Sequence, residues 1–225
     1  MKQTRYTLRA LARLLAYPDD QLRSELSLLV DAIDEEAALP AARRAELRAL
    51  AIGLQRLDPM EIESRYVETF DRGRATSLHL FEHVHGDSRD RGPAMIDLAQ
   101  TYEKAGLFLS PEELPDHLCV VLEFASTQPP QVAKSFLGEV AHILNAIFSA
   151  LLQRESPYAA VIAAVLEMAG EKPQAVPITQ DEPMDESWAE PQAFDGCSTR
   201  GQARPGEAQP IHIVRPSRSA ERAAA

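Results

Sequence analysis

Cysteine, basic charge and long apolar runs are all scarce in this sequence of 225 residues. Its two cysteines, Cys119 and Cys197, are too few for a disulfide framework or a cysteine-rich metal site. The 23 Lys and Arg residues against 34 Asp and Glu residues give a formal net charge of −11. This charge excludes nucleic acid as a main partner, because phosphate binding needs a basic surface. No apolar run approaches the roughly 18 residues that span a bilayer, so we expect no stable membrane insertion.

The first twenty residues interrupt their apolar stretch with charged side chains and contain no small-residue cleavage site. They therefore do not match a secretory signal peptide. Hydrophobic residues make up 45% of the chain and charged residues 25%, which is the composition of an ordinary soluble globular protein. We expect the protein to be cytoplasmic.

The composition changes near Gly170 and divides the chain into two parts. Residues 171–225 contain no leucine, seven of the 16 prolines, and only six Ile, Val or Phe residues. A segment this poor in apolar side chains cannot bury enough surface to offset the entropy lost on ordering. We therefore expect one folded domain over residues 1–170 and a Pro-rich, largely disordered tail over residues 171–225. The tail is first acidic and then basic, which fits either a docking arm or a solvated tail.

Apolar residues in the first 170 positions recur at spacings of three and four, which is the helical period. The longest such run covers residues 132–151. Asp58 with Pro59, and Ser110 with Pro111, are typical helix start signals. No window shows the alternation typical of strands. The sequence predicts an all-α, single-domain helical bundle of about seven to nine helices.

Residues 70–95 interrupt this helical pattern with a dense polar segment. It carries three of the six histidines, His79, His83 and His85, among many acidic and basic side chains. Loops of this kind often hold functional residues, which makes the segment the first candidate for a functional site.

Residues 79–83 match the pattern H-x-x-E-H of inverted zinc proteases. On a helix, His79 and His83 would project from one face, as zinc requires, and Glu82 would be the general base. A zinc-dependent hydrolase or metal-binding protein is therefore one alternative. The other is that these imidazoles hydrogen-bond to neighbouring carboxylates and hold a loop. We favour the second, because three defined positions in five arise readily by chance and nothing singles out a third ligand.

Other catalytic arrangements are absent from the sequence. There is no G-x-S-x-G motif and no phosphate-binding glycine loop. Cys119 lies in an apolar stretch typical of a buried helix face, and His117 beside Asp116 has no nucleophile next to it. The Asp116–His117 pair could act as a proton relay, but apart from the zinc pattern above these residues form no complete catalytic arrangement.

Three stretches, in this order along the chain, resemble one protein family. They are YVETFD at residues 66–71, SLHLFEHVHGDSRDRG at residues 77–92 and ELPDHL at residues 113–118. They closely resemble the respiratory nitrate reductase assembly chaperones, the NarJ-type or delta subunit proteins, which are relatives of the TorD/DmsD maturation chaperones. The third stretch is similar to the E-P-x-D-H signature of that wider superfamily, with Leu114 inserted before Pro115. The resemblance covers roughly residues 5–170 and extends to residues 210–213 in the tail.

The resemblance implies an all-helical chaperone with no catalytic activity and no cofactor of its own. Such chaperones bind the apo catalytic (alpha) subunit of nitrate reductase in the cytoplasm, partly through the N-terminal segment of that subunit. They keep it competent for molybdenum-cofactor insertion and complex assembly. Cofactor-delivery proteins are further candidate partners.

We hypothesise that an amphipathic helix of the partner binds in a groove between helices. Acidic residues would attract Lys or Arg of the partner, and histidines would make its affinity depend on pH near neutrality. Core packing of Tyr66 and Phe70, and helix capping by Asp116 and His117, stay open as alternatives. The predicted partner-peptide-binding residues are Tyr66, Phe70, Asp71, His83, Glu113, Asp116, His117, Leu118, Val121 and Leu122.

Overall fold

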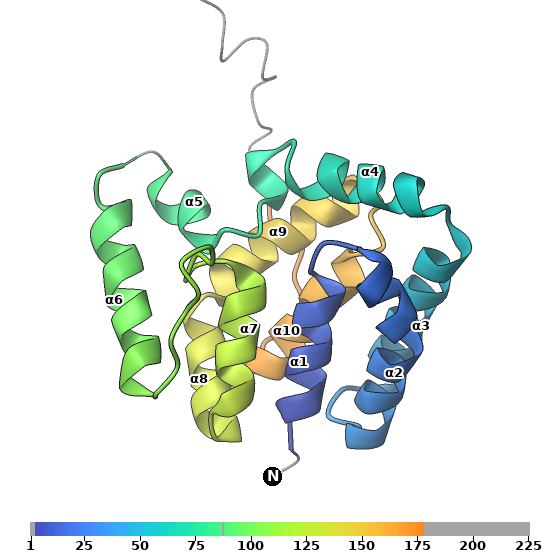
Figure 1. Ribbon diagram of the computed structural model, residues 1–225, viewed down its shortest axis with the longest axis horizontal. Coiled ribbons are helices and arrows are strands. Elements are labelled where there is room, and N and C mark those ends of the chain that lie inside the picture. Colours follow the sequence, from blue (N-terminus) through green and yellow to red (C-terminus); the bar gives the residue numbers. More distant parts are fainter. Residues whose placement is uncertain (1–2, 87, 178–225) are drawn as a thin grey trace, which may run out of the picture. The chain divides into compact units, whose positions relative to one another are not determined.

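A computed structural model describes residues 3–86 and 88–177 of the chain. Within these residues the protein forms ten α-helices and one 3-10 helix, and no β-strand (Figure 1). The elements are α1 (Arg5–Leu14), α2 (Asp20–Glu36), α3 (Ala41–Arg56), α4 (Pro59–Phe70), η1 (Arg74–Thr76), α5 (Leu80–His85), α6 (Arg91–Lys104), α7 (Leu118–Thr127), α8 (Pro130–Glu139), α9 (Ala141–Gln153) and α10 (Ala159–Ala169). The predicted all-α fold is confirmed. The predicted disordered tail lies, from residue 178 onward, outside the described residues.

Two features bring the number of helices above the predicted seven to nine. The short helix α5 lies inside the polar segment of residues 70–95, where periodicity indicated no helix. The long apolar run of residues 132–151 is divided at Val140 into α8 and α9, which meet at 67°. Among the described residues no single helix has both the length and the apolar composition to cross a bilayer. The bent pair α8 and α9 meets the two criteria only when its helices are taken together.

Local capping explains where several helices begin and end. The Asp19 carboxylate accepts the Leu22 N–H at 2.7 Å and starts α2, and the Asp58 carboxylate accepts the Met60 N–H at 3.0 Å and starts α4. The start signal at Ser110 and Pro111 fails, because α7 begins only at Leu118. Pro115 explains the difference, since a proline inside a helix lacks an N–H and clashes with the preceding turn.

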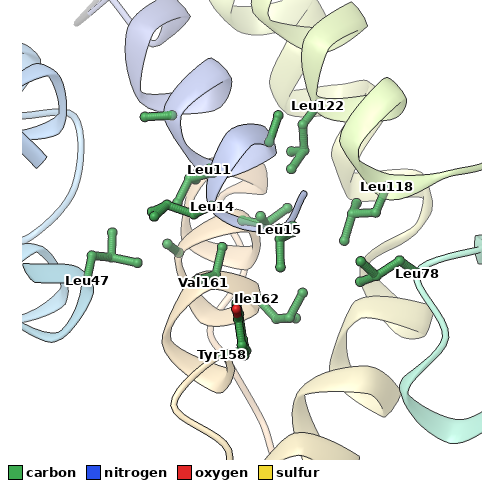
Figure 2. Close-up of a cluster of buried hydrophobic side chains, with 14 of the residues drawn as sticks. Leu11, Leu14, Leu15, Leu47, Leu78, Leu118, Leu122, Tyr158, Val161 and Ile162 are labelled. Carbon is green, nitrogen blue, oxygen red and sulfur yellow. The ribbon is translucent and has the colours of Figure 1, made fainter. Parts of the chain in front are cut away.

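The core lies around α1, which contacts α2, α7 and α10. In Figure 1, α1 lies between α7 and α2, with α10 behind it. Figure 2 shows leucines of α1, α3 and α7 meeting branched residues of α10. The side chains labelled there are Leu11, Leu14, Leu15, Leu47, Leu78, Leu118, Leu122, Tyr158, Val161 and Ile162, and all are buried. Burial of apolar surface on this scale is the main stabilising contribution to the fold.

The chain continues past α10 along the surface of α9. Gln174 donates its backbone N–H to Asn145 Oδ1 at 2.9 Å, and Val176 donates to Ser149 Oγ at 2.8 Å. The two acceptors are four residues apart on the helix and the two donors two residues apart on the extended segment. These spacings match, because four helical residues rise about 6 Å and two extended residues about 6.6 Å.

Candidate functional site

The second and third of the three sequence stretches lie side by side in the structure. His79 and His117 form an isolated antiparallel β-bridge. The Leu80 N–H donates to the Asp116 carbonyl at 3.1 Å, and the Leu118 N–H donates to the Leu78 carbonyl at 2.8 Å. The polar segment before α5 is thereby joined to the loop that enters α7.

Asp116 is completely buried at this junction. Its Oδ2 accepts the Phe81 N–H at 3.1 Å, and its Oδ1 lies 3.5 Å from His79 Nδ1. Arg91 Nη2 lies 3.6 Å from the same carboxylate. Burial by itself raises the pKa of Asp116, but the hydrogen bonds from His79 and Phe81 and the charge of Arg91 outweigh it and hold the pKa below its usual value. Asp116 is therefore an ionised carboxylate with three partners.

Arg91 connects this buried carboxylate to the half-buried carboxylate of Glu82. Its guanidinium lies 3.5 Å from Glu82 Oε1, and the other oxygen of Glu82 accepts the Ser77 hydroxyl at 2.6 Å. The set Ser77, His79, Glu82, Arg91 and Asp116 is called the Asp116 network below. It ties the start of α6 to α5 and to the loop before α7. The role of this network is structural, because its charged groups are paired with one another.

The geometry does not fit the zinc pattern proposed for residues 79–83. His79 precedes α5 with an extended backbone, so His79 and His83 do not share a helix face. Glu82 is engaged by Ser77 and Arg91, and His83 Nε2 donates to the Ser77 carbonyl at 2.9 Å. Among the described residues no group of three His, Cys, Asp or Glu side chains is placed to hold a metal ion. The imidazoles instead hold the loop, His79 through a carboxylate as expected and His83 through a backbone carbonyl.

His79 and His117 are in ring contact and have opposite environments. Their centroids lie 4.9 Å apart in an edge-to-face arrangement. The hydrogen bond to Asp116 raises the pKa of His79. Burial lowers the pKa of His117, and the charge of His79 lowers it further. As the pH falls, His79 is therefore expected to bind a proton before His117 does.

We expect His79 and His117 to titrate on opposite sides of the ordinary histidine pKa of about 6.5. Because the pKa of His79 is raised in the folded state, His79 stabilises the fold below the unfolded pKa of about 6.5. This contribution is lost as the pH rises through the pKa of His79 in the folded protein. A lowered pKa means that the fold loses stability below pH of about 6.5, as the pH falls toward the folded value of His117. NMR titration of the imidazole protons, assigned with His79→Gln and His117→Gln, tests the order, and a reversed order contradicts it.

The predicted groove residues fall into three groups. Five are buried in the core, namely Tyr66, Phe70, Leu118, Val121 and Leu122. Asp116 belongs to the Asp116 network, with His83 and His117 half-buried beside it. Asp71 and Glu113 are exposed. Burial lowers the pKa of His117, and the charge of the nearby Asp71 opposes this lowering, which places the end of α4 close to the ring beside the network.

Tyr66 and Phe70 anchor α4 through an aromatic cluster. Tyr66 is 6% exposed and Phe70 5% exposed, and each packs against Tyr158 with ring centroids 6.1 and 5.0 Å apart. The Tyr66 hydroxyl donates to the Leu15 carbonyl at 2.8 Å. The Tyr158 hydroxyl is buried and has no hydrogen-bond partner in the described part of the chain. The hydroxyl of Tyr66 therefore stabilises the fold through a hydrogen bond, and the hydroxyl of Tyr158 makes none among the described residues.

This difference predicts opposite results for two matched substitutions. Tyr66→Phe should lower the free energy of unfolding by about 1–2 kcal/mol, because the buried Leu15 carbonyl loses its donor. Tyr158→Phe should leave it unchanged within about 0.5 kcal/mol, or raise it slightly, because no bond is lost. Urea unfolding followed by circular dichroism measures both, and a greater loss for Tyr158→Phe would contradict the assignment.

Two cavities lie on either side of α4. A cavity of about 570 Å³ lies where α3, α4 and the turn between α9 and α10 meet. A second, of about 280 Å³, is lined by Tyr17 and by residues of α4 that include Met60, Glu63 and Val67. Both are in or near the size range of small-ligand and side-chain pockets, about 300–1,000 Å³.

Residues 36–164 match the model of the nitrate reductase delta subunit family. The chain belongs to this family. It is 41% identical over 187 residues to the nitrate reductase molybdenum cofactor assembly chaperone NarJ of Escherichia coli K12, covering 82% of this chain and 78% of NarJ. It is 38% identical over 188 residues to NarW of the same strain, covering 84% of this chain and 78% of NarW. The resemblance seen in the sequence is thereby confirmed.

A solved structure shares the fold of this delta subunit family member. It is the crystal structure of a protein from Archaeoglobus fulgidus assigned to redox enzyme maturation, with a TM-score of 0.53 and 20% identity. The match covers 76% of this chain and 96% of that one. At this identity the likeness supports the all-α fold alone.

Sequence reasoning about this family member missed the partners of Asp116 and both cavities. The polar segment of residues 70–95 contains His79, Glu82 and Arg91, but these three residues are not among the predicted partner-binding residues. The dense alternation of opposite charges in residues 82–91 was the available signal for an ion-pair network. Nothing in the sequence indicates a cavity, because its walls come from α3, α4 and the α9–α10 turn.

Proposed function

We propose that this delta subunit family member is a dedicated chaperone that binds the apo catalytic (alpha) subunit of a respiratory nitrate reductase. In this proposal it acts in the cytoplasm and keeps its client competent for molybdenum-cofactor insertion and complex assembly. The observation that carries the proposal is the 41% identity to the assembly chaperone NarJ over most of both chains. No described residue favours the zinc-hydrolase alternative.

The client contact in this proposal is the N-terminal segment of the catalytic subunit, bound as an amphipathic helix. The net charge of −11 favours a segment with Lys or Arg and speeds its encounter. Among the predicted binding residues, the exposed Asp71 and Glu113 and the half-buried His83 and His117 are accessible to such a segment. The buried members, such as Leu118 and Leu122, hold the surrounding helices in place. Cofactor-delivery proteins are further partners in this proposal.

A pull-down from anaerobic, nitrate-grown cells tests this function. The full chain, tagged, should enrich the catalytic subunit from cells unable to make the molybdenum cofactor, and much less of it from cells with normal cofactor synthesis. Deleting the gene should leave the catalytic subunit without molybdenum. Equal recovery of the mature and apo enzymes would indicate a permanent subunit, and fully molybdenum-loaded enzyme in the deletion strain would contradict the proposal.

A further inference from the structure

The larger cavity beside α4 has an apolar floor. Leu54 and Leu57 come from α3 and the residue after it, Ile62 comes from α4, and Pro157 and Tyr158 come from the turn that enters α10. Tyr158 stands at the start of α10, at the lower edge of the core cluster in Figure 2. An apolar wall of this kind with a few polar groups at the rim is typical of a binding pocket.

The positive charges at the rim are already engaged. Arg154 Nη1 donates to the backbone carbonyls of Glu68 at 3.1 Å and Thr69 at 3.4 Å. Arg65 forms an ion pair with Glu61, one helical turn away. These cations hold the end of α4 and its outer face in place.

The negative charges at the rim are not engaged. Glu68 and Glu155 are exposed and line the cavity, and neither carboxylate has a hydrogen bond or ion pair with a described residue. Hydrogen bonds to neutral carbonyls leave the charge of Arg154 in place. With Glu61 included, the rim carries three carboxylates against two guanidinium groups. This excess of one negative charge, together with two carboxylates that have no described partner, favours a cationic ligand group over a phosphate.

The backbone at Glu155 adds an independent observation. Its φ is 51°, in the left-handed region, where it follows α9 and precedes Ser156, whose N–H donates to the Leu151 carbonyl at 2.9 Å. This position after a helix is usually glycine, because a side chain there costs about 1 kcal/mol or more. The chain instead holds a glutamate at the cavity rim, and such strained positions cluster at binding sites.

We infer that this cavity is a pocket for an apolar side chain of a partner peptide that carries Lys or Arg beside it, with Glu68 and Glu155 receiving the cation. The inference rests on the proposed function and assigns the client segment a place away from the Asp116 network. The apolar floor takes the side chain, and the unpaired carboxylates set the requirement for a neighbouring positive charge.

Calorimetric titration of the full chain with a synthetic peptide of the cognate catalytic subunit's N-terminal segment tests the pocket. The double variant Glu68→Gln/Glu155→Gln should weaken binding about tenfold at low salt, the loss expected when charge-assisted contacts worth about 1.4 kcal/mol are removed. The matched control is Asp31→Asn/Glu139→Gln, which removes the same charge from exposed positions without hydrogen-bonded partners among the described residues. It should bind as wild type does.

A second variant tests the cavity itself. Ser156→Trp places a large ring at the half-buried rim, where the Ser156 hydroxyl makes no hydrogen bond to a described residue. It should abolish peptide binding while its unfolding midpoint stays near that of wild type.

The results of these titrations distinguish a failure of the pocket assignment from a failure of the proposed chaperone function. If the wild-type chain binds the peptide and the carboxylate pair behaves like its control, the pocket is wrong and the chaperone function stands. If inorganic phosphate displaces the peptide, the cavity is an anion site and the inference is overturned. If the wild-type chain does not bind the peptide at all, the proposed client contact fails and the pocket assignment fails with it.

Discussion

Replacing Asp116 with alanine is expected to lower the free energy of unfolding by about 2–3 kcal/mol, because the change removes a buried carboxylate that accepts a backbone N–H and pairs with His79 and Arg91. The carboxylate is fully buried and receives the Phe81 N–H at 3.1 Å, with His79 and Arg91 within 3.6 Å. Its removal leaves the part-buried Phe81 N–H without its acceptor, and Glu82 is then the one carboxylate among the described residues that remains paired with the Arg91 guanidinium. Urea unfolding at neutral pH, followed by circular dichroism, measures the loss.

Two further variants identify the cause of that loss. Glu112→Ala removes an exposed carboxylate without a hydrogen-bonded partner among the described residues, and its effect should stay within about 0.5 kcal/mol. Asp116→Asn removes the charge and keeps the size, so its loss should be intermediate. A small loss for Asp116→Ala, equal to that of Glu112→Ala, would contradict the account of the network.

The pH dependence of the same variants has a defined sign. The pKa of Asp116 is lowered in the folded state, so its stabilising contribution is present above the unfolded value of about 3.9 and is lost as the pH falls through the folded value. The stability difference between wild type and Asp116→Asn should therefore be largest near neutral pH and shrink below pH of about 4. A difference that stays constant into this acidic range would show that the charge of Asp116 is not what stabilises the fold.

Local sequence signals predicted most of the helices because those helices begin and end through short-range contacts. Asp19 and Asp58 accept first-turn amides, and Gly170 has the left-handed φ of 81° that ends α10. The break at Val140 was not predictable in this way, since the apolar period continues through it. Both α8 and α9 pack on α10, so the break lies where the tertiary packing changes from one helix to the other. Gly138, two residues earlier, lowers the cost of the bend.

The site was less predictable than the fold, since its contacts join distant positions. His79 and Asp116 are 37 residues apart, and no spacing rule relates them. The family resemblance selected three stretches, and two of them meet at the His79–His117 bridge. Periodicity on α7 indicated an apolar stripe, but a stripe at helical spacing is the same pattern whether it faces a core or a groove. Only the packing of α7 on α1 decides between them.

Replacing Leu122 with alanine tests that decision directly. Leu122 is 0% exposed and belongs to the cluster between α1 and α7, so the substitution should lower the free energy of unfolding by about 3 kcal/mol through lost burial and a remaining cavity. The matched control is Leu152→Ala on α9, where the side chain is 45% exposed and the loss should be below about 1 kcal/mol. Urea unfolding of both variants gives the comparison.

Peptide affinity measured on the same two proteins distinguishes a core residue from a groove residue. A core leucine changes stability strongly and affects peptide binding only through the folded fraction, which is corrected from the unfolding curve. A groove leucine would do the reverse. Its truncation would change the stability of the free protein little, because the position is open there, but it would remove a buried contact from the complex. If Leu122→Ala unfolded like wild type and bound the peptide at least tenfold more weakly, α7 would form a groove wall and the packing against α1 would be wrong.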